Sequence, residues 1–295
     1  MYNKCLDMIG NGPIIELNEI KKKYGFEGKL YAKYEGYNLT GSIKDKAVIN
    51  IIKDLEAKDI LKKGMTIVEA TSGNTGISLS LIGRIMGYNV IIVMPANMSF
   101  ARRKLIERFG ARLILTNKEE GMSGAINKAI ELSKNNNTIL FNQFKRYANV
   151  EAHIKMTAQE IDRELQGKID VIICGIGSAG TIMGISKYYK NNPHIKIVGV
   201  EPKSSPIISK GLLGKHNIQG IGAGFYPPLL DMNLINDIIT VSDEDAYACS
   251  EDLLNYEGLF VGPSSGAALA ASLKYKNDGL RVLVILPDNG YRYLE

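Results

Sequence analysis

The sequence predicts an α/β protein with mostly parallel sheets, and two observations support this. Short β-branched runs alternate with helical patterns, which is typical of parallel strands joined by crossover helices. The 295 residues, 45% of them hydrophobic, are enough for two domains with sizeable cores. Strands are expected over 66–70, 89–94, 112–116, 138–141, 171–174, 195–200, 238–241 and 281–286.

Helical patterns lie between these strands, and several have recognisable ends. An amphipathic helix is expected over 43–58. Ser99 is expected to cap a helix that ends at Gly110, because a serine hydroxyl can accept a free N–H group of the first helical turn. Ser242 and Asp245 predict a start similar to a capping box for another helix, which ends at Gly258.

Neither a low-complexity linker nor a repeat marks a domain boundary, so the division is inferred from the order of the strands. The four central strands, between 66 and 141, are expected to form a smaller sheet. We therefore expect a smaller α/β domain over 36–146. A larger α/β domain is expected from 1–35 together with 147–295.

Charge and composition exclude several classes of protein. The net charge of +5 comes from interspersed acids and bases, so nucleic acid is not an expected partner. No apolar run approaches the roughly 20 residues that span a bilayer, and the first residues lack the segments of a signal peptide, which predicts a cytoplasmic protein without membrane contact. The three cysteines and three histidines lack metal-ligand spacing, so neither a metal site nor a disulfide framework is expected.

A first candidate binding loop, TSGNTG over 71–76, follows the strand over 66–70 and leads into a helical pattern. It offers hydroxyls, an amide and free backbone N–H groups at a helix N-terminus, where the peptide dipoles favour an anion. A polar capping turn is the alternative interpretation. Two glycines and three side-chain donors on one turn favour binding.

A second loop, GIGSAGT over 175–181, follows the strand over 171–174 and opens another helix. It matches G-x-G-x-x-G, and Glu201 ends the next strand about 20 residues later, as in the dinucleotide-binding fingerprint. An NAD-dependent oxidoreductase is therefore an alternative from a different class. The fingerprint alone is weak, because a monophosphate on a helix N-terminus needs the same glycines and hydroxyls.

Two more glycine-rich stretches lie at 218–227 and 262–268. In the second, Ser264 and Ser265 stand at the start of a helical pattern, where either serine alone is interpreted as a cap. Because strand ends and helix starts share one edge of an α/β sheet, all four loops are expected to converge on a single crevice. Lys44, between the turn and the helix of GSIKDKAV, is expected to face it too.

Taken in order, GSIKDKA, ATSGNTGISL, GIGSAGTIMG, IQGIGAGFYP and GPSSGAAL resemble the motifs of the cysteine synthase (O-acetylserine sulfhydrylase) family, within the fold-type II pyridoxal-phosphate enzymes. The likeness covers nearly the whole chain, from IGNGPIIEL to PDNGYRYL. It implies two three-layer α/β domains with mostly parallel sheets, similar to the tryptophan synthase β subunit. It also implies pyridoxal 5′-phosphate as the cofactor.

The resemblance implies roles for individual residues. Lys44 would form the Schiff base with the cofactor aldehyde, and burial would lower its pKa so that it serves as nucleophile and base. The cofactor would be held by Lys44, Asn74 at the ring oxygen, Ser264 at the ring nitrogen, and a phosphate cup of Gly177, Ser178, Ala179, Gly180 and Thr181. The substrate would be bound by Thr71, Ser72, Asn74, Thr75, Gln143 and Gly222.

The reaction implied by the resemblance is β-replacement, in which Lys44 removes the α-proton, the β-substituent leaves and a nucleophile adds. The expected activity is that of a cysteine synthase, which converts O-acetylserine and sulfide into cysteine and acetate. O-phosphoserine is an alternative donor. A further alternative is an enzyme that consumes cysteine, releases hydrogen sulfide and forms lanthionine, serine or cystathionine.

The chain departs from the family pattern after Gln143 and Phe144. The family commonly continues with an asparagine-proline pair, whereas this chain has Lys145 and Arg146. A carboxylate-bearing thiol or a phosphorylated donor would gain from Arg146 if its guanidinium points inward. A surface basic pair without a role is the alternative. The resemblance further implies a homodimer and, in some members, a complex with serine acetyltransferase.

Overall fold

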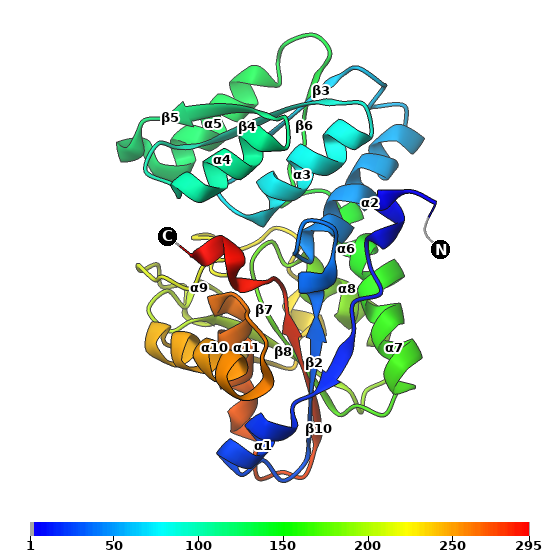
Figure 1. The fold of residues 1–295 in the computed structure, drawn as a ribbon, viewed down its shortest axis with the longest axis vertical. Coiled ribbons are helices and arrows are strands. Elements are labelled where there is room, and N and C mark those ends of the chain that lie inside the picture. Colours follow the sequence, from blue (N-terminus) through cyan, green and yellow to red (C-terminus); the bar gives the residue numbers. More distant parts are fainter. Residues whose placement is uncertain (1–2, 295) are drawn as a thin grey trace.

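Two open sheets, one above the other, organise the computed structural model, which describes residues 3–294 (Figure 1). The larger sheet has the strand order β1-β2-β10-β7-β8-β9, and only β1 is antiparallel to its neighbour. Its strands are β1 (Ile14–Glu16), β2 (Lys29–Tyr34), β7 (Val171–Gly175), β8 (Lys196–Pro202), β9 (Asp237–Val241) and β10 (Arg281–Leu286).

The smaller sheet has four parallel strands in the order β5-β4-β3-β6. They are β3 (Thr66–Ala70), β4 (Asn89–Pro95), β5 (Arg112–Thr116) and β6 (Thr138–Leu140). The α-helices are α1 (Asn18–Tyr24), α2 (Lys44–Ala57), α3 (Asn74–Ile85), α4 (Phe100–Arg108), α5 (Gly121–Leu132), α6 (Ala148–Ala152), α7 (Gln159–Leu165), α8 (Gly180–Tyr189), α9 (Ile207–Lys210), α10 (Asp243–Glu257) and α11 (Pro263–Ser272).

Helices cover both faces of each sheet, because the central strands are apolar on both sides. Along β10, Val282, Val284 and Leu286 pack with α1, α10 and α11, whereas Leu283 and Ile285 pack with α7 and α8 on the other face. The smaller sheet packs α2, α3 and α4 on one face and α5 on the other. The chain therefore has two three-layer α/β units, as the sequence predicts.

All eight strands expected from the sequence are present, with shifts at their ends. Two strands were missed. β1 is only three residues long, and β2 has the sequence KLYAKY, whose two lysines obscure its buried character. The domain boundaries stay a prediction, although Ala148 packs with the core of the smaller sheet and Val150 with that of the larger one.

The predicted helix ends have mixed outcomes. The Ser242 hydroxyl accepts the N–H of Asp245 at 3.1 Å, and Gly258 ends α10 in the left-handed conformation, as predicted. Ser99 is the N-cap residue of α4, but its hydroxyl has no hydrogen-bond partner among residues 3–294, so the predicted cap bond is wrong. No helix in this range is long and apolar enough to cross a membrane.

Helix α2 joins the two units. Its N-cap residue, Ile43, packs in the core of the larger sheet, and the Ile43 N–H donates to the carbonyl of Pro287 at 2.8 Å. The helix then continues into the core of the smaller sheet, where Val48, Ile52 and Leu55 are fully buried. Lys44 therefore lies at the boundary between the two cores.

A buried ion network ties the same helix to the larger sheet. Lys46 is fully buried and lies 2.7 Å from both Glu35 Oε1 and Glu160 Oε2, and Lys33 of β2 lies 2.9 Å from Glu160 Oε2. Burial opposes ionisation of Glu160, but the two lysine charges outweigh it and hold the pKa of this carboxyl below its usual range. Removing any one of these four side chains would therefore leave a buried charge without one of its partners.

Replacing Lys46 with methionine is expected to lower the free energy of unfolding by about 3–5 kcal/mol, because two buried carboxylates lose a shared cation. Urea unfolding at neutral pH measures the loss. The control is Lys58→Met at the end of the same helix, where the ion pair with Asp54 is exposed and contributes about 0.5 kcal/mol or less. Equal losses in the two variants would contradict the network's role.

Candidate active site

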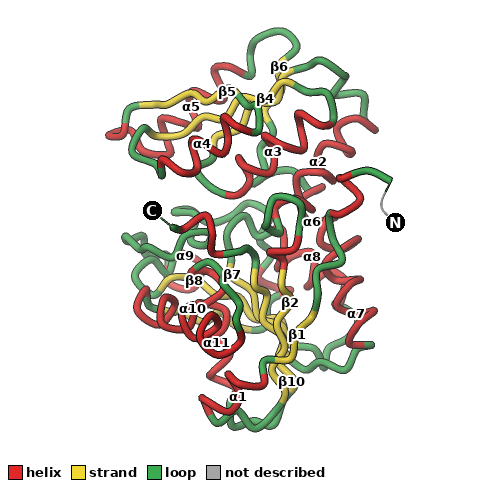
Figure 2. Tube along the Cα trace, in the orientation of Figure 1, coloured by secondary structure: helices red, strands yellow, loops and turns green. Residues whose placement is uncertain are grey.

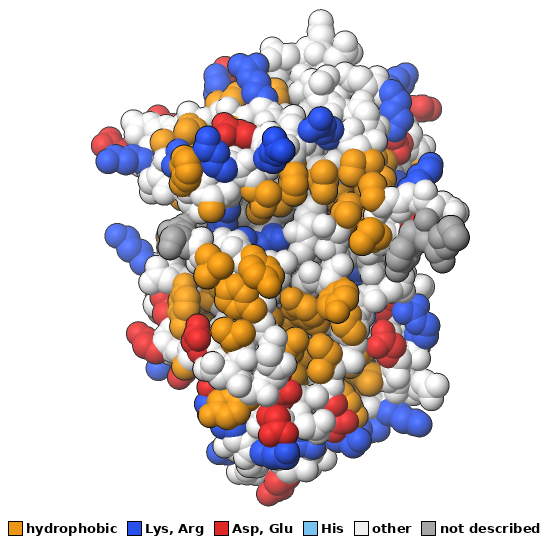
Figure 3. Space-filling view, viewed as in Figure 1, with side chains coloured by type: hydrophobic (Ala, Val, Ile, Leu, Met, Phe, Trp, Pro, Cys, Tyr) orange, Lys and Arg blue, Asp and Glu red, His pale blue; other side chains and the backbone are white. Residues whose placement is uncertain are grey.

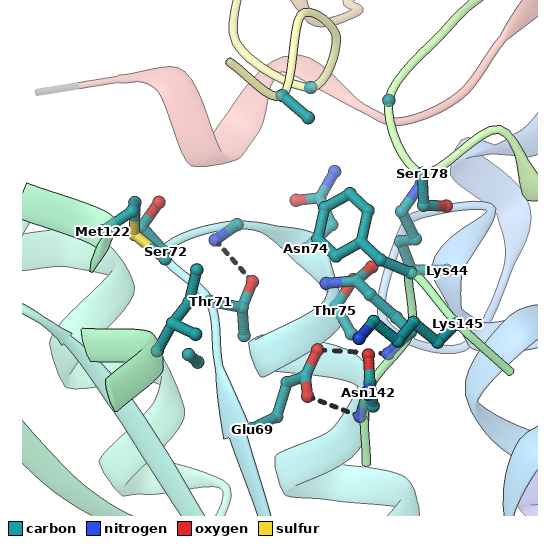
Figure 4. A pocket seen from close by; sticks show the side chains of 18 of the residues that line it. Lys44, Glu69, Thr71, Ser72, Asn74, Thr75, Met122, Asn142, Lys145 and Ser178 are labelled. Carbon is teal, nitrogen blue, oxygen red and sulfur yellow. Dashed lines mark hydrogen bonds between the residues drawn. The ribbon is translucent and has the colours of Figure 1, made fainter. Parts of the chain in front are cut away.

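Loops gather between the two sheets (Figure 2). A pocket of about 430 Å³ is lined by residues from both α/β units (Figure 4). One face of α5 supplies an apolar part of its wall. The rest comes mainly from the residues after β3, β6, β7 and β10, and from the starts of α2, α3 and α11. These are carboxyl ends of parallel strands and amino ends of helices, as the sequence predicts. The glycine-rich stretch 218–227 contributes Gly220, Ile221, Ala223 and Phe225.

Lys44 begins α2 and lines both this pocket and a smaller adjoining cavity (Figure 4). The side chain is partly buried, and desolvation lowers the pKa of the amine, while the nearby charge of Asp288 acts in the opposite direction. Burial prevails, so a larger fraction of the amine is neutral and nucleophilic than in an exposed lysine.

The adjoining cavity is a cup of backbone amides. It is lined by residues 177–181 together with Lys44. The N–H groups from Gly177 to Thr181 donate to no acceptor within the described part of the chain. They precede and begin the ten-residue helix α8, whose dipole favours an anion at this end.

Local sequence explains why the cup stays open. Ala179, the N-cap residue of α8, has φ of 66°, and this left-handed turn directs successive N–H groups to one side. A Cβ at Gly177 would lie 2.7 Å from the carbonyl oxygen of Gly220, and one at Gly180 would collide with the side chain of Asn149. Glycine is therefore required at both positions.

A buried hydroxyl lies at the start of α11, beside Gly220. Ser264 lines the pocket in the first turn of α11, and its Oγ has no partner among residues 3–294. Ser265 Oγ is also buried and unpaired but does not line the pocket. The N-cap residue is Gly262, so the interpretation of either serine as a cap is wrong.

The TSGNTG loop and Gln143 form one wall. Thr71, Ser72, Asn74, Thr75 and Gln143 all line the pocket. The backbone N–H groups of Ser72, Asn74 and Thr75 have no acceptor in the described range, and the Thr75 hydroxyl donates to Gln143 Oε1 at 2.6 Å. Gly222 does not line the pocket itself, although both of its neighbours do.

Arg146 does not point into the pocket. Its Nε donates to the Phe141 carbonyl at 2.6 Å and its Nη2 to the Leu140 carbonyl at 2.9 Å, so the guanidinium holds the end of β6. The condition for its predicted contact with a substrate carboxylate is therefore not met. Its neighbour Lys145 does line the pocket (Figure 4).

Three supporting residues were not found from the sequence. Glu69 accepts the backbone N–H groups of Asn142 and Gln143, and burial raises the pKa of its carboxyl to about 7. Asn149 Nδ2 donates to both Gln143 O and Ser178 Oγ, and so joins the pocket wall to the cup. His153 Nε2 lies 3.3 Å from Thr181 Oγ1. No motif or spacing indicates these roles.

The site suits a flat ligand with an anion at one end and an electrophile near its middle. The open amide cup matches a phosphate, Lys44 beside it matches an aldehyde, and the unpaired Ser264 hydroxyl matches a ring nitrogen. These are the groups of pyridoxal phosphate. A dinucleotide fits less well, because the Glu201 carboxylate already accepts the N–H groups of Ile208 and Ser209.

Comparison with known proteins agrees with this chemistry. Residues 6–288 match the family described as pyridoxal-phosphate dependent enzyme. Cysteine synthase B of Campylobacter jejuni is 45% identical over 100% of this chain and 97% of its own length. The crystal structure of an Entamoeba histolytica cysteine synthase has a TM-score of 0.96 and 36% identity, covering 100% of this chain and 90% of that one.

A hydrogen sulfide-producing enzyme from Fusobacterium nucleatum has a TM-score of 0.94 and 38% identity, with 100% of both chains covered. The match extends over the fold and over every loop that forms the pocket. Together with the pocket-lining Lys44 and the amide cup, these likenesses show that the chain belongs to the cysteine synthase family of pyridoxal-phosphate-dependent enzymes.

Proposed function

We propose that this enzyme is a cysteine synthase, which makes cysteine and acetate from O-acetylserine and sulfide. The observation that carries the proposal is that Lys44 lines the same cavity as the unsatisfied amides of residues 177–181. A lysine held beside an anion cup is the arrangement that binds an aldehyde cofactor by its phosphate and its carbonyl together. The cysteine synthases among the curated relatives support the substrate assignment.

Pyridoxal phosphate, when bound, supplies the electron-withdrawing ring that acidifies the α-proton of the amino acid. In our proposal Gly177, Ser178, Ala179, Gly180 and Thr181 hold its phosphate, Asn74 its ring oxygen and Ser264 its ring nitrogen. A serine hydroxyl does not keep that nitrogen protonated, so loss of a β-substituent is favoured over a long-lived carbanion.

The amino-acid donor is held by its carboxylate. In our proposal the unpaired N–H groups of Ser72, Asn74 and Thr75 and the hydroxyls of Thr71 and Ser72 surround this anion. Gln143, which accepts the Thr75 hydroxyl, closes the site. Gly222 contributes by letting the backbone next to it approach the ligand closely. Lys44 Nζ then accepts the α-proton and later returns it, which needs the neutral amine that burial favours.

Purified native enzyme is expected to be yellow and to form cysteine from O-acetylserine and sulfide. Lys44→Ala is expected to lower the rate by at least about a thousandfold, because one amine serves as both cofactor anchor and base. Visible absorbance and a cysteine assay measure these outcomes. Lys58→Ala, at the end of the same helix, exposed and outside the pocket, is the control for nonspecific damage. Unchanged cysteine formation by Lys44→Ala would refute the proposal.

A second candidate is the consumption of cysteine with release of hydrogen sulfide. Lys145 lines the pocket and offers a cation to the carboxylate of a second amino-acid thiol. A structural neighbour is itself a hydrogen sulfide-producing enzyme. Sulfide release from cysteine alone, faster than cysteine synthesis from O-acetylserine or O-phosphoserine, would favour this second candidate over the first.

Replacing Ser264 with alanine is expected to weaken the binding of pyridoxal phosphate about fivefold and to shift its visible band, because the ring nitrogen loses a partner. Ser265→Ala is the matched control, since both hydroxyls are buried and unpaired in one helical turn but only Ser264 lines the pocket. Titration of the cofactor into apo-protein measures both. Equal effects in the two variants would remove Ser264 from the site.

We also propose a homodimer, as the family resemblance implies. The face seen in Figure 3 carries hydrophobic side chains over α2 and α3 and over the C-terminal segment. Tyr37, Tyr291 and Leu294 are among the exposed large hydrophobic residues of the chain. Sedimentation velocity is expected to give twice the chain mass at micromolar concentration. A single species of one chain mass would contradict the dimer.

Binding of serine acetyltransferase and a cytoplasmic location stay predictions from the sequence.

A further inference from the structure

The side chain of Asn74 is held at both ends by residues that follow β10. Asn74 Nδ2 donates to Asp288 Oδ2 at 2.6 Å, and Arg292 Nη1 donates to Asn74 Oδ1. Asn74 is the first residue of α3, whereas Arg292 belongs to the 3₁₀ turn η7 (Gly290–Tyr293). The amide of a pocket residue is thus clamped between an acid and a base from a distant segment.

Asp288 is placed firmly for this role. It is only 1% exposed, and its Oδ2 also accepts the hydroxyl of Tyr293. Its Oδ1 has no partner within residues 3–294 and lies against Gly262, where a side chain would not fit. Arg292 is tied as well, because its Nη2 donates to the carbonyl of Thr40.

Charge at both ends decides which way the amide faces. If the Asn74 amide turned over, its oxygen would meet the Asp288 carboxyl and its NH₂ group would meet the Arg292 guanidinium. Either contact leaves a buried polar group facing a like partner, which is costly. The observed orientation uses one of the two Nδ2 hydrogens, and the second has no acceptor in the described part of the chain.

We propose that Asp288 and Arg292 are a positioning pair that fixes the Asn74 amide so that its remaining N–H is always presented to the pocket. The proposal rests on the proposed role of Asn74 at the ring oxygen of the cofactor. Asp288 also lines the pocket and its charge acts on Lys44, but in this proposal its effect on cofactor affinity is transmitted through Asn74. The C-terminal residues 288–293 are in this way part of the active site.

The test is a double-mutant cycle read as affinity for pyridoxal phosphate, titrated into apo-protein and followed by visible absorbance. Asp288→Asn is expected to weaken binding about tenfold when Asn74 is present, because the amide loses its charged anchor. In an Asn74→Ala background the same change is expected to alter affinity by less than about twofold. This readout needs no turnover, so it stands even if cysteine synthesis is not the activity.

Asp252→Asn is the matched control, because Asp252 is another buried carboxylate, held by Lys23 and Tyr24 away from the pocket. It is expected to leave cofactor affinity unchanged. Equal loss from Asp288→Asn with and without Asn74, or no loss at all, would overturn the proposal. If circular dichroism shows that this variant does not fold, Arg292→Lys tests the other end of the clamp, with the same dependence on Asn74 expected.

Discussion

The geometry of parallel strands is the constraint on which this site depends. The strands β3, β6, β7 and β10 end at the pocket, and the helices α2, α3, α8 and α11 begin there. Every helix start leaves N–H groups without partners, so unpaired donors accumulate at one place. Anion binding then needs no arginine, and none is present among the pocket-lining residues of the described chain. Glycines at these turns leave the unpaired N–H groups accessible, because they have no side chain that could cover them.

Much of this was predictable from the sequence because it is local. A buried parallel strand is a short apolar run, and a phosphate-binding turn needs small residues directly before a helix, so each could be found from a few consecutive residues. The eight strands from β3 to β10, the four loops and Lys44 are all of this kind. Resemblance to a known family then implied a role for each loop, and these roles stay proposals.

The parts that could not be predicted depend on contacts between distant positions. Asn74 and Asp288 are 214 positions apart, and nothing in either segment indicates that they meet. The strand β2 was missed because a lysine in a short run usually indicates an exposed position. Lys33 is buried only because it forms an ion pair with the distant Glu160. The Arg146 side chain points away from the pocket because its guanidinium donates to two backbone carbonyls at the end of β6. A sequence pattern does not reveal this rotamer. Pattern alone contains none of these facts.

The position of Lys44 at the boundary of two cores has a mechanical consequence. The first turn of α2 is bonded to the strand end after β10, while its later turns belong to the other unit. Closure of the smaller unit on a ligand would therefore pivot at this turn. In such a closure the amine would stay beside residues 177–181, and residues 71–75 would move with the smaller sheet.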